Sequence, residues 1–201
     1  MYVPAHFRAD EAPAWALMAA QPFGLVITAQ ADEPWVSQVP FLVDAATRRV
    51  RWHLAAANPQ VAHLQAAAAV KLVFLGPHAY VSPRWYAAPN VPTWNYAAVH
   101  VTGRLCALDA AATTALVATL TREYEGPAGL GPFETSATYR NLLNSIRGFE
   151  LTEVELIAKF KLSQNRPAAD QVAVARELSA SADPSARALG ALMHEHAPGA
   201  S

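Results

Sequence analysis

Cysteine is almost absent from this chain of 201 residues, which contains only Cys106. An internal disulfide is therefore excluded, and so is a cysteine-rich zinc site. Because a chain without disulfides suits a reducing compartment, we expect a cytoplasmic protein. The sequence also lacks a charged segment followed by an apolar one at its start, and it has no apolar run long enough to span a bilayer. Neither a signal peptide nor a membrane segment is expected.

Charge is scarce as well, since only 15% of the residues are charged and the formal net charge is −1. Such a chain lacks the broad positive field that usually drives DNA binding, so we expect no direct sequence-specific contact with DNA. The G-x-S-x-G, P-loop and G-x-G-x-x-G motifs are missing. No pair of carboxylates stands out as an acid and a base, and no catalytic residue is assigned.

The apolar pattern predicts a mainly β protein, with helices inserted late and at the C-terminus. Strands are expected over 23–28, 36–43, 50–54, 71–75, 79–82, 93–108 and 149–161. Helices are expected over 10–21, after 59, and over 109–125, 138–147, 168–179 and 184–194. Six or seven strands in a meander describe a small antiparallel barrel with α additions. We expect one domain over 1–166, with 167–201 as a C-terminal helical extension of it.

Two lysines, Lys159 and Lys161, end the last predicted strand, and Ser163, Gln164 and Asn165 follow them. Alternate side chains of a strand share a face, so the two ammonium groups point the same way and repel unless water or an anion separates them. A solvated edge strand whose lysines discourage aggregation is one interpretation. A phosphate, carboxylate or flavin bound between the lysines and the polar side chains is the other.

A second candidate lies where the strand over 50–54 runs through three alanines into a helix that begins at Asn58 and Pro59. The free N–H groups of a helix start attract anions, and alanines let a ligand approach the backbone. The alternative is a plain strand–helix connection with an asparagine cap, which is the commoner case. His53, on the strand, and His100, on a later one, are each more typical of a structural histidine than of a base.

Large aromatic side chains, among them Tyr80, Trp94 and Tyr96, flank a proline-bounded loop over 83–92. Tryptophan and tyrosine offer a rigid apolar floor with hydrogen-bonding groups, which suits a planar heterocycle. The alternative is that they plug the end of a barrel or lie at a subunit interface. So many aromatic groups are hard to bury inside one small barrel, and we therefore expect a homodimer with its ligand cleft at the interface.

Six segments, in this order, resemble the PaiB-like family of FMN-binding negative transcriptional regulators. They are Met1 to Phe7; His53-Leu54-Ala55 with Asn58-Pro59-Gln60; Gly76-Pro77 with Tyr80 and Ser82-Pro83; Trp85-Tyr86; Val91 to Tyr96 with His100; and Lys159 to Arg166. The resemblance covers nearly the whole chain. It implies FMN as the cofactor and a regulatory role. The alternative function is that of an FMN-dependent oxidoreductase, which would act on a small substrate with a nicotinamide donor.

That family is similar in fold to the pyridoxamine phosphate oxidases, in which FMN lies between two subunits of an antiparallel split barrel. The resemblance implies that the turn around Asn58 faces the flavin phosphate or ribityl chain and that the segment around Asn95 lines the ring pocket. Lys161 falls where the oxidases carry an arginine. The cofactor-binding positions expected in all are His53, Asn58, Gln60, Trp94, Asn95, Tyr96, His100, Lys159, Lys161, Ser163 and Gln164.

Overall fold

The computed structural model of the chain describes residues 1–30, 33–66 and 69–196, which form two compact units. Unit 1 contains Met1–Ala14, Leu75–Val99 and Ile157–Ser201, and unit 2 contains Trp15–Phe74 and His100–Leu156. Three long strands run from one unit into the other. The helical extension expected over 167–201 falls in unit 1, and its last part, 197–201, lies outside the described residues.

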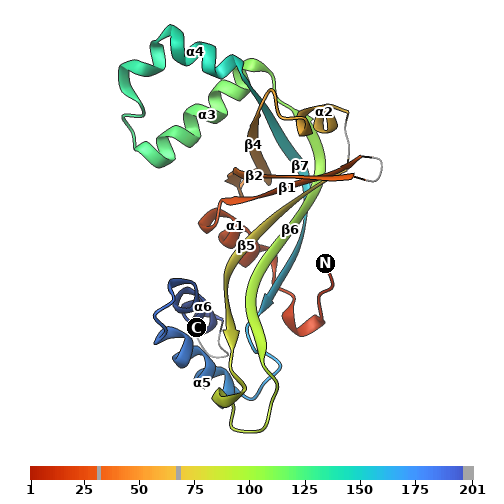
Figure 1. Cartoon of the computed structure of the whole chain (residues 1–201), viewed down its shortest axis with the longest axis vertical. Coiled ribbons are helices and arrows are strands. Elements are labelled where there is room, and N and C mark those ends of the chain that lie inside the picture. The colour runs from red at the N-terminus through yellow and green to blue at the C-terminus, as the bar shows by residue number, and fades with distance from the viewer. Residues whose placement is uncertain (31–32, 67–68, 197–201) are drawn as a thin grey trace. The chain divides into compact units, whose positions relative to one another are not determined.

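Figure 1 labels the helices and strands of the described residues. The helices are α1 Glu11–Ala20, α2 Gln60–Gln65, α3 Ala110–Glu125, α4 Ala137–Asn144, α5 Ala168–Ser179 and α6 Pro184–Glu195. The strands are β1 Phe23–Gln30, β2 Glu33–Pro40, β3 Leu42–Asp44, β4 Arg49–Ala55, β5 Val70–Val81, β6 Thr93–Ala107 and β7 Ile146–Lys161. Short 3-10 helices occur at Ala5–Phe7, Pro83–Trp85 and Gly131–Thr135.

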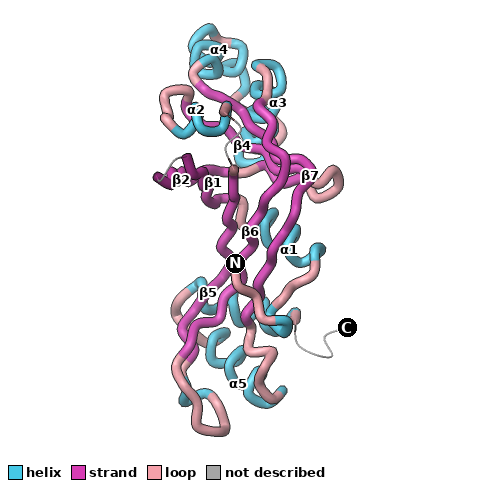
Figure 2. Tube along the Cα trace, turned by 90° about the vertical axis from the view of Figure 1, so that its right-hand side faces the viewer, coloured by secondary structure: helices cyan, strands magenta, loops and turns pink. Residues whose placement is uncertain are grey.

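The strands form one antiparallel sheet in the order β2-β1-β5-β6-β7-β4-β3. Figure 2 shows the three longest strands, β5, β6 and β7, running alongside one another. The two edge strands, β2 and β3, are consecutive in the chain, and only Phe41 separates them. Consecutive Cα atoms are about 3.8 Å apart, so the single residue between them keeps the end of β2 close to the start of β3. Within unit 2 the sheet is therefore curled into a barrel.

Aromatic side chains fill this barrel. The rings of Phe41 and Phe74 lie 4.8 Å apart, those of Phe41 and Trp52 lie 5.9 Å apart, and Trp52 stacks on Phe149 at 5.9 Å. None of these four side chains is more than 1% exposed. Large aromatic groups dominate the energetics of a core because each removes a large apolar area from water. The alternation of buried residues along β4 follows from this packing.

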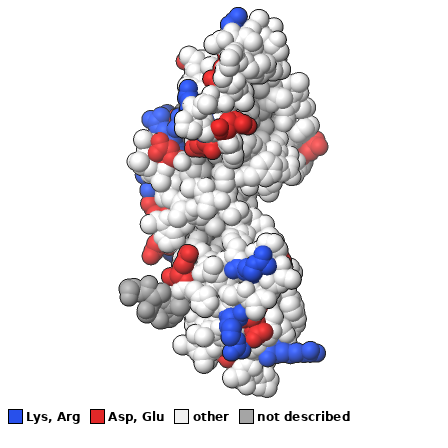
Figure 3. Space-filling view, turned by 90° about the vertical axis from the view of Figure 1, so that its left-hand side faces the viewer, with Lys and Arg blue, Asp and Glu red and all other residues white. Residues whose placement is uncertain are grey.

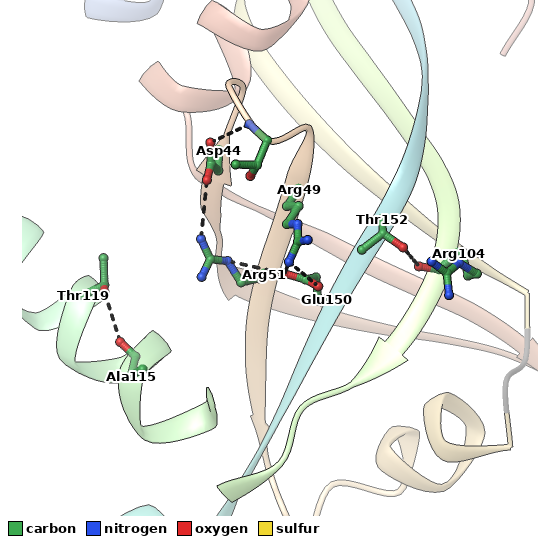
Figure 4. A network of polar contacts seen from close by, with 9 residues as sticks. Asp44, Arg49, Arg51, Arg104, Ala115, Thr119, Glu150 and Thr152 are labelled. Atoms are coloured by element: carbon green, nitrogen blue, oxygen red, sulfur yellow. Dashed lines mark hydrogen bonds and ion pairs between the residues drawn. The ribbon is translucent and has the colours of Figure 1, made fainter. Parts of the chain in front are cut away.

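The opposite face of β4 carries charge instead. Arg49 donates to both carboxylate oxygens of Glu150 at 3.3 Å, and Arg51 lies 3.7 Å from Asp44 and 3.8 Å from Glu150. Figure 4 shows Arg51 between the two carboxylates. Since β3, β4 and β7 each supply a member, this network helps to fix the register of the three strands.

In unit 1, α5 and α6 pack side by side (Figure 1). Ser185 on α6 donates to the carbonyl of His78 on β5 at 2.9 Å and accepts from its N–H at 3.2 Å. Asp170 on α5 accepts from the N–H of Ala87 at 2.9 Å. The helices expected over 168–179 and 184–194 are confirmed almost residue for residue, because their caps and prolines are local signals.

Two expectations about sheet order and strand breaks are wrong. The strands do not form a meander, because the β3–β4 hairpin returns to pair with β7. The segment expected as one strand over 36–43 is two strands, since the chain bends at Phe41 to place that ring in the core.

Two further boundaries differ from expectation. A break at Gly76 and Pro77 was expected, but β5 continues through both residues. The neighbouring strand β1 pairs only with residues 70–73 of β5, so the missing N–H of Pro77 costs no hydrogen bond to β1. The helix expected over 138–147 ends at Asn144, and Gly148 is part of β7 because it pairs with His53 of β4. Pairing between distant strands outweighed the local helical pattern.

Candidate functional site

The end of β7 places Lys159 against the N-terminal segment of the chain, within unit 1. Its Nζ donates to the carbonyl of Tyr2 at 3.3 Å and lies over the rings of Tyr2 and Tyr96, at 6.0 and 5.4 Å from their centroids. A backbone bridge between Arg8 and Lys159 holds the N-terminal segment along the strand. Among the ion pairs of the described residues, none gives Lys159 a carboxylate partner.

Lys161 is confined by neutral oxygen atoms. Its Nζ donates to Thr93 Oγ1 at 2.7 Å and to the carbonyl of Trp94. Burial lowers the pKa of Lys161, and the positive charges of Lys159 and Arg166 lower it further. An ammonium group has three N–H donors, so two such hydrogen bonds leave one for a ligand. The neighbouring positive charges mean that an anion here would relieve repulsion.

Asn95 and Ser163 are bonded to each other. Asn95 is fully buried, and its Nδ2 donates to Ser163 Oγ at 2.9 Å and to Met193 Sδ at 3.7 Å. Successive residues of a strand point to opposite faces of the sheet. Asn95 therefore points to the face of β6 opposite to Trp94 and Tyr96, and its place in the ring pocket stays a prediction.

Gln164 closes the end of the strand. Its Oε1 accepts from the N–H of Leu162 at 2.7 Å, and its Nε2 donates to the carbonyl of Phe160 at 2.6 Å. Ser163 has a φ of 67°, the left-handed conformation that turns the chain out of β7. In this conformation Ser163 and Gln164 shape the turn, and the hydroxyl of Ser163 and one N–H of Gln164 are left over by these bonds, so their place in a flavin site stays a prediction.

Exposed aromatic rings lie close to the lysines. Trp94 is 54% exposed, and its ring lies 6.2 Å from His78 and 6.4 Å from Tyr80. Tyr96 has the same orientation along β6, and Lys159 lies over its ring. We call the following residues the aromatic–lysine face: Tyr80, Trp94, Tyr96, Lys159 and Lys161. Rings beside cations suit a planar, anionic ligand.

In unit 2, Gln60 fastens α2 to β1 and β2. The residue is fully buried, and its Nε2 donates to the carbonyl of Val26 at 3.0 Å, to Thr28 Oγ1 at 3.2 Å and to the carbonyl of Trp35 at 3.1 Å. Asn58 Oδ1 accepts from the N–H of Gln60 at 2.9 Å, so Asn58 caps the helix start as expected. The donors of Gln60 are thus used inside the chain.

The N–H groups around this helix start are engaged as well. Those of Ala56 and Asn58 donate to the carbonyls of Ser145 and Ala55 at 2.8 and 2.9 Å. That of Val61 donates to the carbonyl of Asn58 at 2.9 Å. The expectation of free amide groups for an anion is therefore not supported at these positions.

His53 and His100 are half-buried in unit 2, and each has a buried Nδ1 without a hydrogen-bond partner within the described residues. Burial lowers the pKa of both imidazoles. His53 pairs with Gly148, whose carbonyl accepts from the N–H of Leu108 at 2.9 Å. The extended chain from residue 100, in β6, to residue 108, just after the end of β6, spans roughly 26 Å. The two imidazoles therefore do not share one pocket.

Sequence reasoning missed several partners of the cations. Tyr2 and Thr93 hold the two lysines, and Arg166 donates to Asn90 Oδ1 at 2.9 Å with its guanidinium 5.5 Å from the ring of Tyr86. No local pattern marks these contacts, because each joins segments far apart in the chain.

The fold is shared with solved structures of low sequence identity. A conserved hypothetical protein of Mycobacterium tuberculosis matches with a TM-score of 0.62 and 12% identity, over 83% of this chain and 94% of that chain. The FAD and heme binding protein of Mycobacterium smegmatis matches with a TM-score of 0.62 and 14% identity, over 82% and 78%. The antiparallel seven-stranded sheet with its helices is of the flavin-binding split-barrel class, as expected.

A family model described as "Putative FMN-binding domain" matches residues 1–155, and the chain belongs to this family. It is 31% identical over 202 residues to "Protease synthase and sporulation protein PAI 2" of Bacillus subtilis (strain 168), covering 97% of both chains. It is 30% identical over 129 residues to an uncharacterized protein of Saccharomyces cerevisiae, covering 51% of this chain and 76% of that protein. The expected PaiB-like relationship and FMN as cofactor are confirmed. In the described residues, no helix is long and apolar enough to cross a membrane.

Proposed function

We propose that this protein is a dimeric FMN-binding regulatory protein whose aromatic–lysine face holds part of the flavin. The lysine pair carries the proposal. Lys159 and Lys161 share one face of β7, and no ion pair of the described residues compensates either charge. The exposed Trp94 lies beside Lys161, which donates to its carbonyl. Two uncompensated cations favour an anion and an exposed indole favours a planar ring, and FMN has both.

The residues on this face fit the chemistry of FMN. Lys161 has one N–H left for a phosphate or ring oxygen, and Tyr96 offers a hydroxyl as well as a ring. FMN supplies the redox chemistry when bound. The part of the chain is to bind the flavin, to orient it and to place positive charge near it. The Bacillus subtilis relative is named for protease synthesis and sporulation, which supports a regulatory role.

A second copy of the chain is the partner that we propose for unit 1. Large apolar side chains are exposed there: Leu75 at 52%, Tyr80 at 47%, Val91 at 66%, Trp94 at 54% and Ile157 at 45%. Soluble monomers rarely leave a large contiguous apolar area in water. The separation of His53 from His100 along the sheet also supports a flavin site shared by two copies. One flavin could meet both imidazoles only if His53 came from one copy and His100 from the other. Light scattering at micromolar concentration tests this, and a monomer would refute it.

Direct DNA binding is not part of the proposal. The net charge is −1, and Figure 3 shows one face on which Lys and Arg are interspersed with Asp and Glu. Steering toward a polyanion needs a continuous positive surface. A salt-sensitive, sequence-dependent gel shift with the purified chain would contradict this. The single Cys106, which is a free thiol, supports a cytoplasmic location.

The deciding experiment is a flavin titration followed by quenching of flavin fluorescence. We expect saturable FMN binding with a shifted absorption spectrum. Riboflavin, which lacks the phosphate, is expected to bind more weakly because it loses the charge-assisted contact. A useful cofactor site is well occupied at protein concentrations of about 100 μM. If the protein changes neither the fluorescence nor the absorption spectrum of FMN up to that concentration, the proposed function is wrong.

A further inference from the structure

A cavity of about 390 Å³ lies in unit 2 between α3, α4 and the start of β7. That volume is within the range of ordinary small-molecule pockets. Its wall contains none of the residues assigned to the flavin above. It includes Leu108, Thr113, Leu143, Asn144, Ile146 and Arg147.

The sequence builds this cavity through a close approach of α3 to β7. Asp109 caps α3 by accepting from the N–H of Ala112 at 2.7 Å, which fixes where the helix starts. A Cβ at Gly148 would lie 2.6 Å from Thr113 Oγ1 and 3.2 Å from Leu108 Cδ1, so only glycine permits this contact. Thr113 is buried, with only 5% of its surface exposed. The cavity is therefore closed at this end by tight packing.

A fixed cation lies in its wall. Arg147 Nη1 donates to the carbonyls of Asn144 at 3.0 Å and Ile146 at 2.7 Å, which anchors the guanidinium. Both bonds use the same nitrogen, and a guanidinium has five N–H donors in a planar fork. None of the ion pairs formed in the described part of the chain involves Arg147. An anchored, uncompensated guanidinium is suited to a two-pronged bond with a carboxylate.

The rest of the wall has a polar part, formed by Thr113, Thr114 and Asn144, and an apolar part. The apolar part consists of Leu108, from the connection between β6 and α3, Leu143 of α4 and Ile146 of β7. A phosphate or a dicarboxylate would leave this apolar surface unused and would lack a second cation. A ligand with one carboxylate and a short hydrocarbon chain pairs with the cation and covers the apolar side chains.

We propose that this cavity binds a short-chain aliphatic monocarboxylate, with its carboxylate on Arg147 and its chain against Leu108, Leu143 and Ile146. The site goes beyond the flavin function and does not depend on it. A regulatory protein with such a site would respond to a metabolite of this class independently of its cofactor.

Sodium hexanoate is the probe, with hexanol as the neutral analogue of equal chain length. Binding is followed by NMR shifts of the Leu and Ile methyl groups of the full chain, with and without saturating FMN. A ligand of this size is expected to bind with a dissociation constant on the order of 0.1–1 mM. Hexanol is expected to bind at least about tenfold more weakly, because it lacks the charge-assisted bonds.

Arg147→Gln is the test variant and Arg140→Gln the matched control. Both side chains are exposed and both donate to backbone carbonyls, but Arg140, bonded to Thr135, is not in the cavity wall. Arg147→Gln is expected to weaken hexanoate about ten- to a hundredfold, and Arg140→Gln to leave it unchanged. Ala110→Phe, which fills the cavity from an exposed wall position, is expected to abolish binding.

Three results overturn the proposal. They are hexanoate binding equally well to Arg147→Gln and the parent, hexanol binding as tightly as hexanoate, and no methyl shift with hexanoate up to about 10 mM. Binding that is unchanged by FMN agrees with the proposal, and binding that FMN abolishes contradicts its independence from the cofactor.

Discussion

Replacing Lys161 by glutamine removes one positive charge and keeps a polar side chain with N–H donors. The ammonium uses two of its three N–H groups on Thr93 Oγ1 and the carbonyl of Trp94. The third is the one available to FMN. A charge-assisted hydrogen bond in a partly desolvated site is worth about 1.5–3 kcal/mol. Loss of that bond corresponds to roughly ten- to a hundredfold weaker FMN binding.

The assay is fluorescence titration of the parent, Lys161→Gln and Lys71→Gln with FMN and with riboflavin. Lys71 is an exposed lysine of β5 outside the aromatic–lysine face, and a solvated lysine of this kind contributes almost nothing. If Lys161 faces the phosphate, the variant loses affinity for FMN but not for riboflavin. If it faces the ring, both affinities fall. Equal FMN affinity in all three proteins refutes the assignment and leaves Lys161 with a structural role, in its bonds to Thr93 and to the carbonyl of Trp94.

Three further predictions concern stability. Gln60→Ala should lower the free energy of unfolding by about 1–3 kcal/mol in urea titrations, because it strands buried carbonyls, whereas the exposed Gln65→Ala should change it little. Gly148→Ala should lower the free energy of unfolding by about 1–3 kcal/mol, because the new Cβ meets Thr113 Oγ1. Adding Thr113→Ala should restore part of this loss, and equal stability of Gly148→Ala and the parent would contradict the close contact. Burial lowers the pKa of His53 from its ordinary value near 6.5, so the unfolded chain takes up a proton before the folded chain does, and the free energy of unfolding falls as the pH drops below that value. In urea titrations between pH 5 and 7, His53→Asn should reduce the dependence of the free energy of unfolding on pH by about the slope of one proton.

The candidate site was only partly predictable. The alternation Lys159-Phe160-Lys161 placed both lysines on one face, and both lie against the N-terminal segment, Lys159 over the ring of Tyr2 and Lys161 over that of Phe7. The same alternation, applied to the segment around Asn95, would have separated that residue from its neighbours Trp94 and Tyr96. Treating them as one motif concealed this separation.

The roles of the amides were beyond the reach of sequence. Asn95 and Gln60 carry the same groups as ligand-binding amides, and nothing local shows whether those groups meet a flavin or the protein itself. The structure buries both, with Asn95 joined to Ser163 and Gln60 joined to β1 and β2. Each is bonded through its amide nitrogen, whereas the buried oxygens Asn95 Oδ1 and Gln60 Oε1 have no partner within the described residues.

The sequence by itself determined the elements whose signals lie within a few residues. Asp109 and the pattern that follows it specify α3, and strand alternation specifies β4, because capping and periodicity act over one or two turns of chain. Only the tertiary structure decided that β4 pairs with β7, that Arg49 meets Glu150 across 101 positions, and that a cavity forms beside Arg147. Such contacts depend on how all the strands pack together, and the free energy of that packing is not encoded in any single segment.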